Sequence, residues 1–178
     1  ADSRNLSNGN EENENGINNE KGHSNTSTKI EAKQKDIDDV EFHIAEISAY
    51  KRAERFADPS SERFRTELKE QEKLKVFNLR IKLKDGSSVW DYPVKGNPNR
   101  TKRLDYFAFK FKENIRLMSD TTELPCALYT LVQSQNLTNF VDLVIGFDNT
   151  QIKSKDLTVV FEDDYFDYGR IKLKPTIL

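Results

Sequence analysis

The chain contains few of the residues on which cofactor and metal chemistry depend. Among its 178 residues are one cysteine, two histidines and seven glycines. One cysteine cannot form an internal disulfide, and it can build a zinc site only if both histidines and some carboxylates join it. The sequence also has no Gly-rich phosphate loop, dinucleotide fingerprint or HExxH pattern. We therefore expect no cofactor, no bound metal and no nucleotide chemistry.

Long apolar runs are also missing. Apolar residues make up 35% of the chain, below the roughly 45–50% of ordinary globular proteins. A helix that crosses a bilayer needs about 20 consecutive apolar residues, and no segment approaches this length. The composition therefore predicts no membrane-spanning segment and one folded domain with appendages.

The N-terminal segment has almost no apolar side chains. Those up to residue 35 are Ala1, Leu6, Ile17, Ile30 and Ala32. Most of the rest is Asn, Glu, Ser, Gly and Lys, which cannot bury enough surface to offset the conformational entropy lost on folding. We expect a disordered polar tether over residues 1–36 and a folded domain over 37–178. Because the numbering opens with Ala1 rather than Met, we also expect that a targeting sequence or an anchoring residue was removed, or that the sequence was trimmed.

Charge is unevenly distributed along the chain, whose formal net charge is −2. Residues 1–41 carry a net charge of −5, residues 51–112 carry +8 and residues 113–178 carry −4. Such a separation can steer a charged partner. The basic excess is smaller than in strong polyanion binders, and aromatic side chains are not interleaved with it. We therefore expect no nucleic-acid partner.

Alternating apolar and polar residues predict seven or eight short strands. The expected strands cover 40–49, 77–83, 87–92, 107–112, 126–133, 140–147, 157–161 and 170–174. The first changes phase near Ala45 and Glu46, which predicts a β-bulge. Asp85-Gly86 predicts a tight hairpin turn, and the Pro- and Asn-rich residues 93–102 predict a loop.

Three phenylalanines dominate one of these expected strands. Phe107, Phe109 and Phe111 alternate with polar or small residues, which predicts that all three face the core, opposite residues such as Leu79. On this prediction, replacing Phe109 by Ala costs about 3 to 5 kcal/mol of stability.

One short helix is expected between the first two strands. Asp58 followed by Pro59 is typical of a helix start, and Phe64 and Leu68 give it a narrow apolar stripe through about Glu72. Short strands, frequent turns and a single inserted helix together predict a mainly β fold, an antiparallel β-sandwich of immunoglobulin-like outline.

Five aromatic residues are candidates for binding a ligand or partner. Trp90 and Tyr92 lie on the same face of one expected strand and can stack on a sugar or a peptide, although burial in the core is the alternative. Tyr165, Phe166 and Tyr168 stand beside four carboxylates between two expected strands. This run suits a partner contact or an ordinary solvated turn, and calcium coordination is a further alternative, without EF-hand spacing.

A catalytic site has little support in the sequence. His43 and Cys126 are the only imidazole and thiol of the expected domain, and together they could serve as base and nucleophile. The motif context of known cysteine hydrolases is missing, and Cys126 is better interpreted as a small buried hydrophobe. We therefore expect a protein that is not an enzyme, with a hydrolase as the least favoured alternative.

Three short segments carry a resemblance to a family: Leu124–Tyr129, Asn136–Thr138 and Leu143–Asp148. They are similar to segments of uncharacterised extracytoplasmic proteins of the Bacteroidota. The Asn/Glu/Ser-rich leader resembles the mature start of the lipoproteins of that phylum. The resemblance implies a periplasmic or cell-surface location, with a lipidated cysteine just before Ala1 as the membrane anchor.

These observations together predict a tethered extracytoplasmic interaction module. Its partner would be another protein of the cell envelope, which it would contact as an accessory subunit. The alternative is a β-sandwich that binds a glycan or a small ligand. The residues for that role are Trp90, Tyr92, Tyr165, Phe166 and Tyr168.

Overall fold

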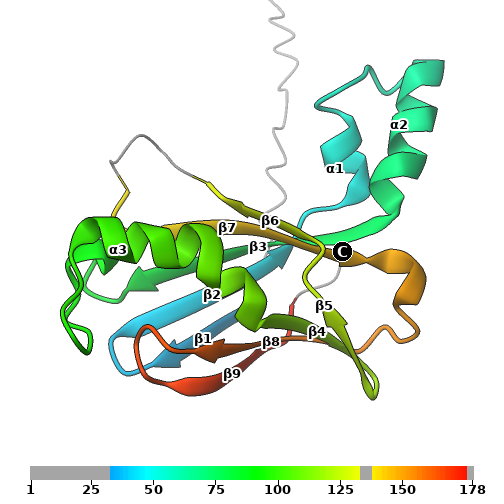
Figure 1. The fold of residues 1–178 in the computed structure, drawn as a ribbon. Coiled ribbons are helices and arrows are strands. Elements are labelled where there is room, and N and C mark those ends of the chain that lie inside the picture. The colour runs from blue at the N-terminus through cyan, green and yellow to red at the C-terminus, as the bar shows by residue number, and fades with distance from the viewer. Residues whose placement is uncertain (1–32, 133–137, 176–178) are drawn as a thin grey trace, which may run out of the picture.

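The computed structural model describes residues 33–132 and 138–175, which form two antiparallel β-sheets with helices at their edges (Figure 1). The five-stranded sheet has the order β1-β2-β3-β7-β6, with strands Lys33–Ile37, Val40–Glu46, Leu74–Leu83, Val141–Asp148 and Leu128–Leu131. The four-stranded sheet has the order β5-β4-β8-β9, with strands Thr122–Pro125, Ile115–Ser119, Leu157–Asp163 and Gly169–Leu173. The predicted mainly β, two-sheet antiparallel architecture is confirmed.

The helical elements are more numerous than the one helix expected. They are α1 (Ala49–Ala53), α2 (Glu62–Glu72), α3 (Arg100–Asp105), the π-helical turn η2 (Tyr106–Lys110), and the 3-10 turns η1 (Val89–Asp91), η3 (Phe111–Asn114) and η4 (Asn149–Gln151). The predicted helix is α2. The others were missed because short helices have too few residues for a 3.6-residue period to be recognised.

The core lies between the two sheets. Along β2, the apolar residues Val40, Phe42 and Ile44 are buried, and the residues between them are only half-buried. The ring of Phe42 lies 5.7 Å from that of Phe161 on β8, so the two sheets meet directly. Because side chains alternate across a strand, this burial explains why the sequence pattern predicted these strands.

Most strands with clear alternation are where the sequence predicts them, and three strands were missed. β3, β7, β8 and β9 match their expected ranges within a few residues, and β6 covers the centre of 126–133. β4 and β5 occupy residues that the sequence left unassigned or as a turn. β1 pairs with β2 from Lys33↔Ile44 to Ile37↔Val40. Residues 33–36 therefore belong to the sheet rather than to the tether, whereas residues 1–32 lie outside the described residues.

The expected bulge near Ala45 and Glu46 is wrong. β2 pairs in regular register with β3 as far as Glu46↔Phe77. Ser48 then starts α1, and its hydroxyl accepts a hydrogen bond from the backbone N–H of Lys51 at 3.3 Å. The change of apolar phase marks the end of the strand and the start of a helix.

The expected hairpin at Asp85-Gly86 is also wrong, although these residues do form a turn, with φ of 75° at Gly86. β3 already has β2 on one side and β7 on the other. Residues 87–92 therefore have no free edge of β3 to pair with. Part of this segment instead forms η1, which buries Trp90.

Residues 107–112 are helical rather than a strand. The Asn99 side chain accepts a hydrogen bond from the backbone N–H of Lys102 at 3.0 Å and so starts α3. Phe107 and Phe111 are each 1% exposed, whereas Phe109 is 73% exposed. A spacing of four residues places two side chains on one helical face, so the Phe107/Phe111 pair fits a helix as well as a strand. The expectation that Phe109→Ala strongly lowers stability is therefore wrong, because this side chain is not in the core.

Candidate interaction surface

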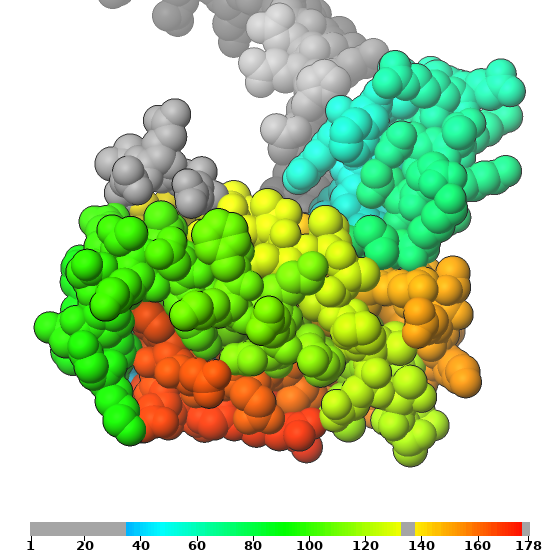
Figure 2. Space-filling view, viewed as in Figure 1, coloured from blue at the N-terminus to red at the C-terminus, as the bar shows by residue number. Residues whose placement is uncertain are grey.

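An insertion between two paired strands is the most distinctive feature of the fold. β2 and β3 are antiparallel neighbours whose last pair is Glu46↔Phe77. Two such strands can be joined by two to five residues. Here residues 47–73 form a helical hairpin of α1 and α2, which projects from the end of the five-stranded sheet (Figure 1). In the space-filling view the hairpin stands out as a separate lobe (Figure 2). We call residues 47–73 the helical hairpin.

Local sequence explains where its second helix begins. The Ser61 hydroxyl accepts a hydrogen bond from the backbone N–H of Phe64 at 3.1 Å, which satisfies one of the free N–H groups of the first turn. Asp58, the expected N-cap, lies three residues too early. Its carboxylate accepts a hydrogen bond from the backbone N–H of Ser60 at 2.8 Å. Asp58 therefore shapes the turn between the helices.

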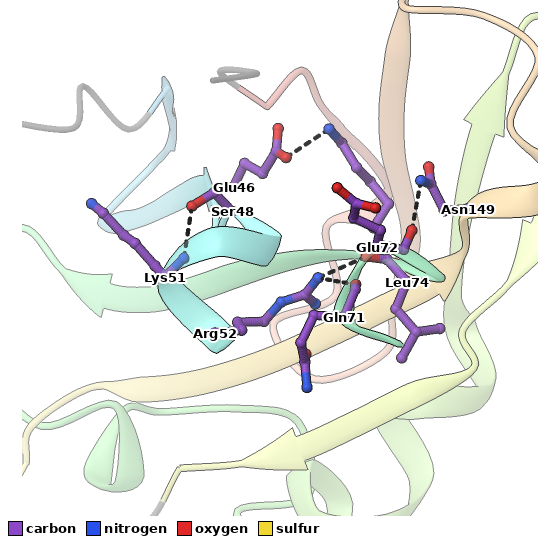
Figure 3. A network of polar contacts seen from close by, with 9 residues as sticks. Glu46, Ser48, Lys51, Arg52, Gln71, Glu72, Leu74 and Asn149 are labelled. Atoms are coloured by element: carbon purple, nitrogen blue, oxygen red, sulfur yellow. Dashed lines mark hydrogen bonds and ion pairs between the residues drawn. The ribbon is translucent and has the colours of Figure 1, made fainter. Parts of the chain in front are cut away.

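A buried arginine joins the two helices of the hairpin (Figure 3). The Arg52 side chain extends from α1, is 8% exposed, and donates hydrogen bonds from its Nη2 to the carbonyl oxygens of Gln71 at 2.5 Å and Leu74 at 2.8 Å. The Gln71 oxygen lies in the last turn of α2, where carbonyl groups lack helical partners and the helix dipole favours a cation, and Leu74 is the first residue of β3. Arg52 thus fixes α1 against the end of α2.

Further polar contacts join the base of the hairpin to the sheet (Figure 3). The Lys75 ammonium lies 2.6 Å from the Glu46 carboxylate, which links the first residues of β3 to the last residue of β2. Asn149, just after β7, donates from its side chain to the Glu72 carbonyl at 2.8 Å and from its backbone N–H to the Lys73 carbonyl at 2.9 Å. The hairpin is therefore held at its base by polar contacts.

The hairpin contributes nothing to the core between the sheets. Among the described residues, the buried apolar cluster contains no member from residues 47–73. Phe64 of α2 is buried, and the Tyr50 ring packs against it at 5.1 Å between ring centroids. Tyr50 is nevertheless 47% exposed and Phe56 is 55% exposed. An element that leaves large aromatic side chains in water without adding to the core is a candidate for binding another molecule.

The structure places three of the five predicted binding residues in the core. Trp90 is 9% exposed, Tyr165 7% and Phe166 9%. The Trp90 indole Nε1 donates a hydrogen bond to the carbonyl oxygen of Thr138 at 3.1 Å, so its polar atom is satisfied inside the protein. These three side chains are unavailable to a ligand unless the fold moves.

The other two predicted binding residues are half-buried. Tyr92 packs edge-on against Phe166 at 5.6 Å, and Tyr168 stacks on Phe166 at 5.8 Å. Tyr92 also lines an open cleft of about 650 Å³. The other residues that line the cleft are Asp39, Leu83, Lys84, Asp85, Ser87, Ser88, Asp91 and Pro93. The structure therefore brings all five aromatics into one region and leaves Tyr92 at a surface hollow.

The acidic run 162–168 has a structural explanation. The Asp163 side chain is 3% exposed and accepts hydrogen bonds from the backbone N–H groups of Tyr165, Phe166 and Tyr168, each at 3.1 Å. Burial raises the pKa of this carboxyl, and the three N–H groups oppose the rise. Within the described residues, no group of three or more acids, histidines or cysteines could hold a metal ion.

His43 and Cys126 lie on opposite faces of the five-stranded sheet. On β2 the side chains of Phe42 and Ile44 point into the core, so His43 points outward, where its Nε2 lies 3.1 Å from the Glu41 carboxylate. Cys126 is 7% exposed and belongs to the core cluster, and burial raises the pKa of its thiol. A base on one face cannot activate a thiol on the other.

Comparison of the chain with protein-family models, with curated proteins and with solved structures found no match in any of the three. Among the described residues, no helix has the length and apolar character needed to cross a membrane.

Proposed function

We propose that the protein is a non-enzymatic interaction module that binds a partner protein through the helical hairpin. One observation carries the proposal: residues 47–73 interrupt two paired strands, add nothing to the core cluster, and expose Tyr50 and Phe56. An insertion that the sheets do not need for their packing is best explained by a role outside the fold.

The side-chain chemistry of the hairpin supports a protein partner. Its exposed aromatics are accompanied by exposed arginines, Arg55, Arg63 and Arg65. Tyrosine, phenylalanine and arginine are enriched at protein–protein interfaces, and tyrosine and arginine are frequent among the residues that dominate their energy. The Arg52 and Asn149 contacts hold this surface in place before binding, which lowers the entropy cost of association.

The proposal includes a tethered, extracytoplasmic location in the cell envelope. The polar composition of residues 1–32 and the resemblance to Bacteroidota lipoproteins support it. An immunoglobulin-like outline is part of the same proposal and is supported by two facing antiparallel sheets. Cell fractionation tests the location: the protein should be recovered with the envelope, and recovery in the cytoplasm contradicts it.

Site-specific photo-crosslinking tests the hairpin as the binding surface. A photoreactive residue at position 55 should give adducts of a few defined masses in cells of the source organism. The Tyr50→Ser/Phe56→Ser double variant should abolish these adducts, because both side chains are exposed and their loss leaves the core intact.

A matched control uses the same photoreactive residue at Lys172, which is exposed on β9. This position should give no adduct of the same mass. Equal adducts from positions 55 and 172, or no adduct from any hairpin position, would contradict the proposal.

The cleft beside Tyr92 favours a second candidate function, the binding of a small ligand. The cleft lies at the end of the sheet where β2 begins, whereas the hairpin follows the end of β2. A glycan array or a fragment screen tests this candidate. Ligand binding that Tyr92→Ala abolishes would support it, and binding that is insensitive to Tyr92→Ala would dispose of it.

A further inference from the structure

The helical segment from α3 to η3, residues 100–114, has a second exposed aromatic surface, unrelated to the hairpin. Its inner face is part of the fold: Phe107 packs 4.8 Å from Tyr165, and Phe111 packs 5.2 Å from Phe161. Arg103, 3% exposed, adds hydrogen bonds from the same face. The position of this segment against the sheets is therefore fixed (Figure 1).

The outer face of this segment presents Phe109 to solvent. Phe109 is 73% exposed, the largest exposed fraction among the large hydrophobic residues described. The residues Tyr106–Lys110 form the π-helical turn η2, and Phe111 follows it as the first residue of η3. Phe107 and Phe111 are buried on the inner side of the segment, and Phe109 and Lys110 between them are exposed. Turns of the π-helical kind are rare in proteins and are frequent at functional sites.

Basic side chains accompany Phe109 on the same segment. Arg100, Lys102, Lys110 and Lys112 are exposed, and none of the four makes an ion pair within residues 33–132 and 138–175. The segment also exposes two acids, Asp105 and Glu113, so its exposed side chains carry a net positive charge. By contrast, the basic residues on the outer face of β3 are paired, Arg80 with Asp142 and Lys82 with Glu41.

This chemistry fits an anionic lipid surface better than a protein. Three of the four cations are lysines, which are depleted at protein–protein interfaces, whereas arginine is enriched there. This segment also exposes one large aromatic side chain, Phe109, whereas the helical hairpin exposes two, Tyr50 and Phe56. An exposed aromatic ring on a segment that also exposes these three lysines suits shallow insertion into the boundary between headgroups and acyl chains.

We propose that residues 100–114 form a membrane-contact surface, in which Phe109 inserts between lipids and Arg100, Lys102, Lys110 and Lys112 attract anionic headgroups. The proposal goes beyond the proposed function and rests on different residues. A single aromatic and four cations give reversible binding only, so the contact acts together with a second attachment to the membrane.

Vesicle co-sedimentation of the full chain tests the proposal. Binding is compared between vesicles of phosphatidylcholine alone and vesicles that also contain phosphatidylglycerol. The chain should sediment with the anionic vesicles at low ionic strength, and much less at high salt or with phosphatidylcholine alone. Lys110→Gln/Lys112→Gln should weaken binding about 20-fold, and Phe109→Ser about tenfold.

The double variant Lys153→Gln/Lys155→Gln is the control, because it removes the same charge from two exposed lysines elsewhere on the surface. It should change vesicle binding less than twofold. Three results would overturn the proposal: no binding to anionic vesicles, equal losses in both lysine double variants, or unchanged binding in Phe109→Ser. The hairpin variant Tyr50→Ser/Phe56→Ser should bind vesicles normally, which separates this test from that of the proposed function.

Discussion

The helical hairpin and the segment from α3 to η3 are both helical additions to the same pair of sheets, but they are built differently. The α3–η3 segment buries Phe107 and Phe111 in the core cluster, whereas the hairpin contributes no residue to that cluster. Each contains a buried arginine that donates to backbone carbonyl oxygens. Arg103 connects α3 to loop residues beside the core, while Arg52 connects α1 to the end of α2 and to the first residue of β3. The α3–η3 segment is therefore part of the core, whereas the helical hairpin is attached to the sheets without adding to the core.

The comparison has a consequence for stability. Side chains in the shared core are coupled to global unfolding, so their loss weakens the whole domain. Side chains within the hairpin are coupled mainly to local opening of the hairpin. Substitutions of the same chemical type should therefore have different effects in the two regions.

The largest expected difference comes from Phe107→Ala. Phe107 is 1% exposed and packs against Trp90, Phe111 and Tyr165. Its removal should lower the free energy of unfolding by about 3 to 5 kcal/mol, the range for a buried phenylalanine. Urea titration followed by circular dichroism measures this. A loss below about 1 kcal/mol, comparable to that of a surface substitution, would show that the segment is not part of the core.

The two buried arginines should also differ in their effect on global stability. Arg103→Met leaves the carbonyl oxygens of Tyr92 and Pro98 without their donor and should cost about 2 to 3 kcal/mol of global stability. Arg52→Met should cost less than about 1 kcal/mol globally. It should instead accelerate amide hydrogen exchange in α1 and α2, measured by mass spectrometry. If both variants lowered the global free energy of unfolding equally, the hairpin would be coupled to global unfolding in the same way as the α3–η3 segment, which contradicts the expectation.

The smallest effect is expected for Phe109→Ser. Phe109 belongs to the core-bound segment but points outward, so its replacement should change the free energy of unfolding by no more than about 0.5 kcal/mol. Thermal melts of Phe109→Ser and Phe107→Ala compare the melting temperatures of two variants whose positions lie two residues apart in the same helical segment. A large drop in the melting temperature of Phe109→Ser would instead support the strand over residues 107–112 that the sequence pattern predicts, with Phe109 in the core.

These residues also show how much of the fold could be predicted from the sequence. Strands with clear alternation, such as Leu79 and Ile81 in β3, were predictable because one face is buried and the other is not. Phe107, Phe109 and Phe111 were ambiguous, because the outer two satisfy a period of two and a spacing of four equally. Knowing whether Phe109 is buried would distinguish a strand from a helix. Its burial depends on what packs against it from distant parts of the chain, and a local sequence pattern carries no information about that packing.

The candidate interaction surface was harder to predict than the fold. The sequence predicted α2, but it did not indicate that α1 and α2 pair with each other and leave the sheet. The local signals were the cap residues Ser48 and Ser61. Five aromatic residues were candidates for binding, with burial in the core as the alternative for Trp90 and Tyr92. Trp90, Tyr165 and Phe166 are core residues. The sequence shows an aromatic side chain without showing what covers it.

We expect the two sheets to fold without the helical hairpin. An Asn-Gly turn between Ile47 and Val76, which are already hydrogen-bonded at 2.8 Å, can replace residues 48–75. The deletion removes the hairpin beyond Ile47 together with Leu74 and Lys75, the first two residues of β3. Glu46 is changed to Thr in the same chain, because its partner Lys75 is removed. The shortened chain should unfold in one cooperative urea transition, with a free energy of unfolding within about 1 kcal/mol of that of the intact protein. Loss of the cooperative transition, or a fall of several kcal/mol, would contradict the account.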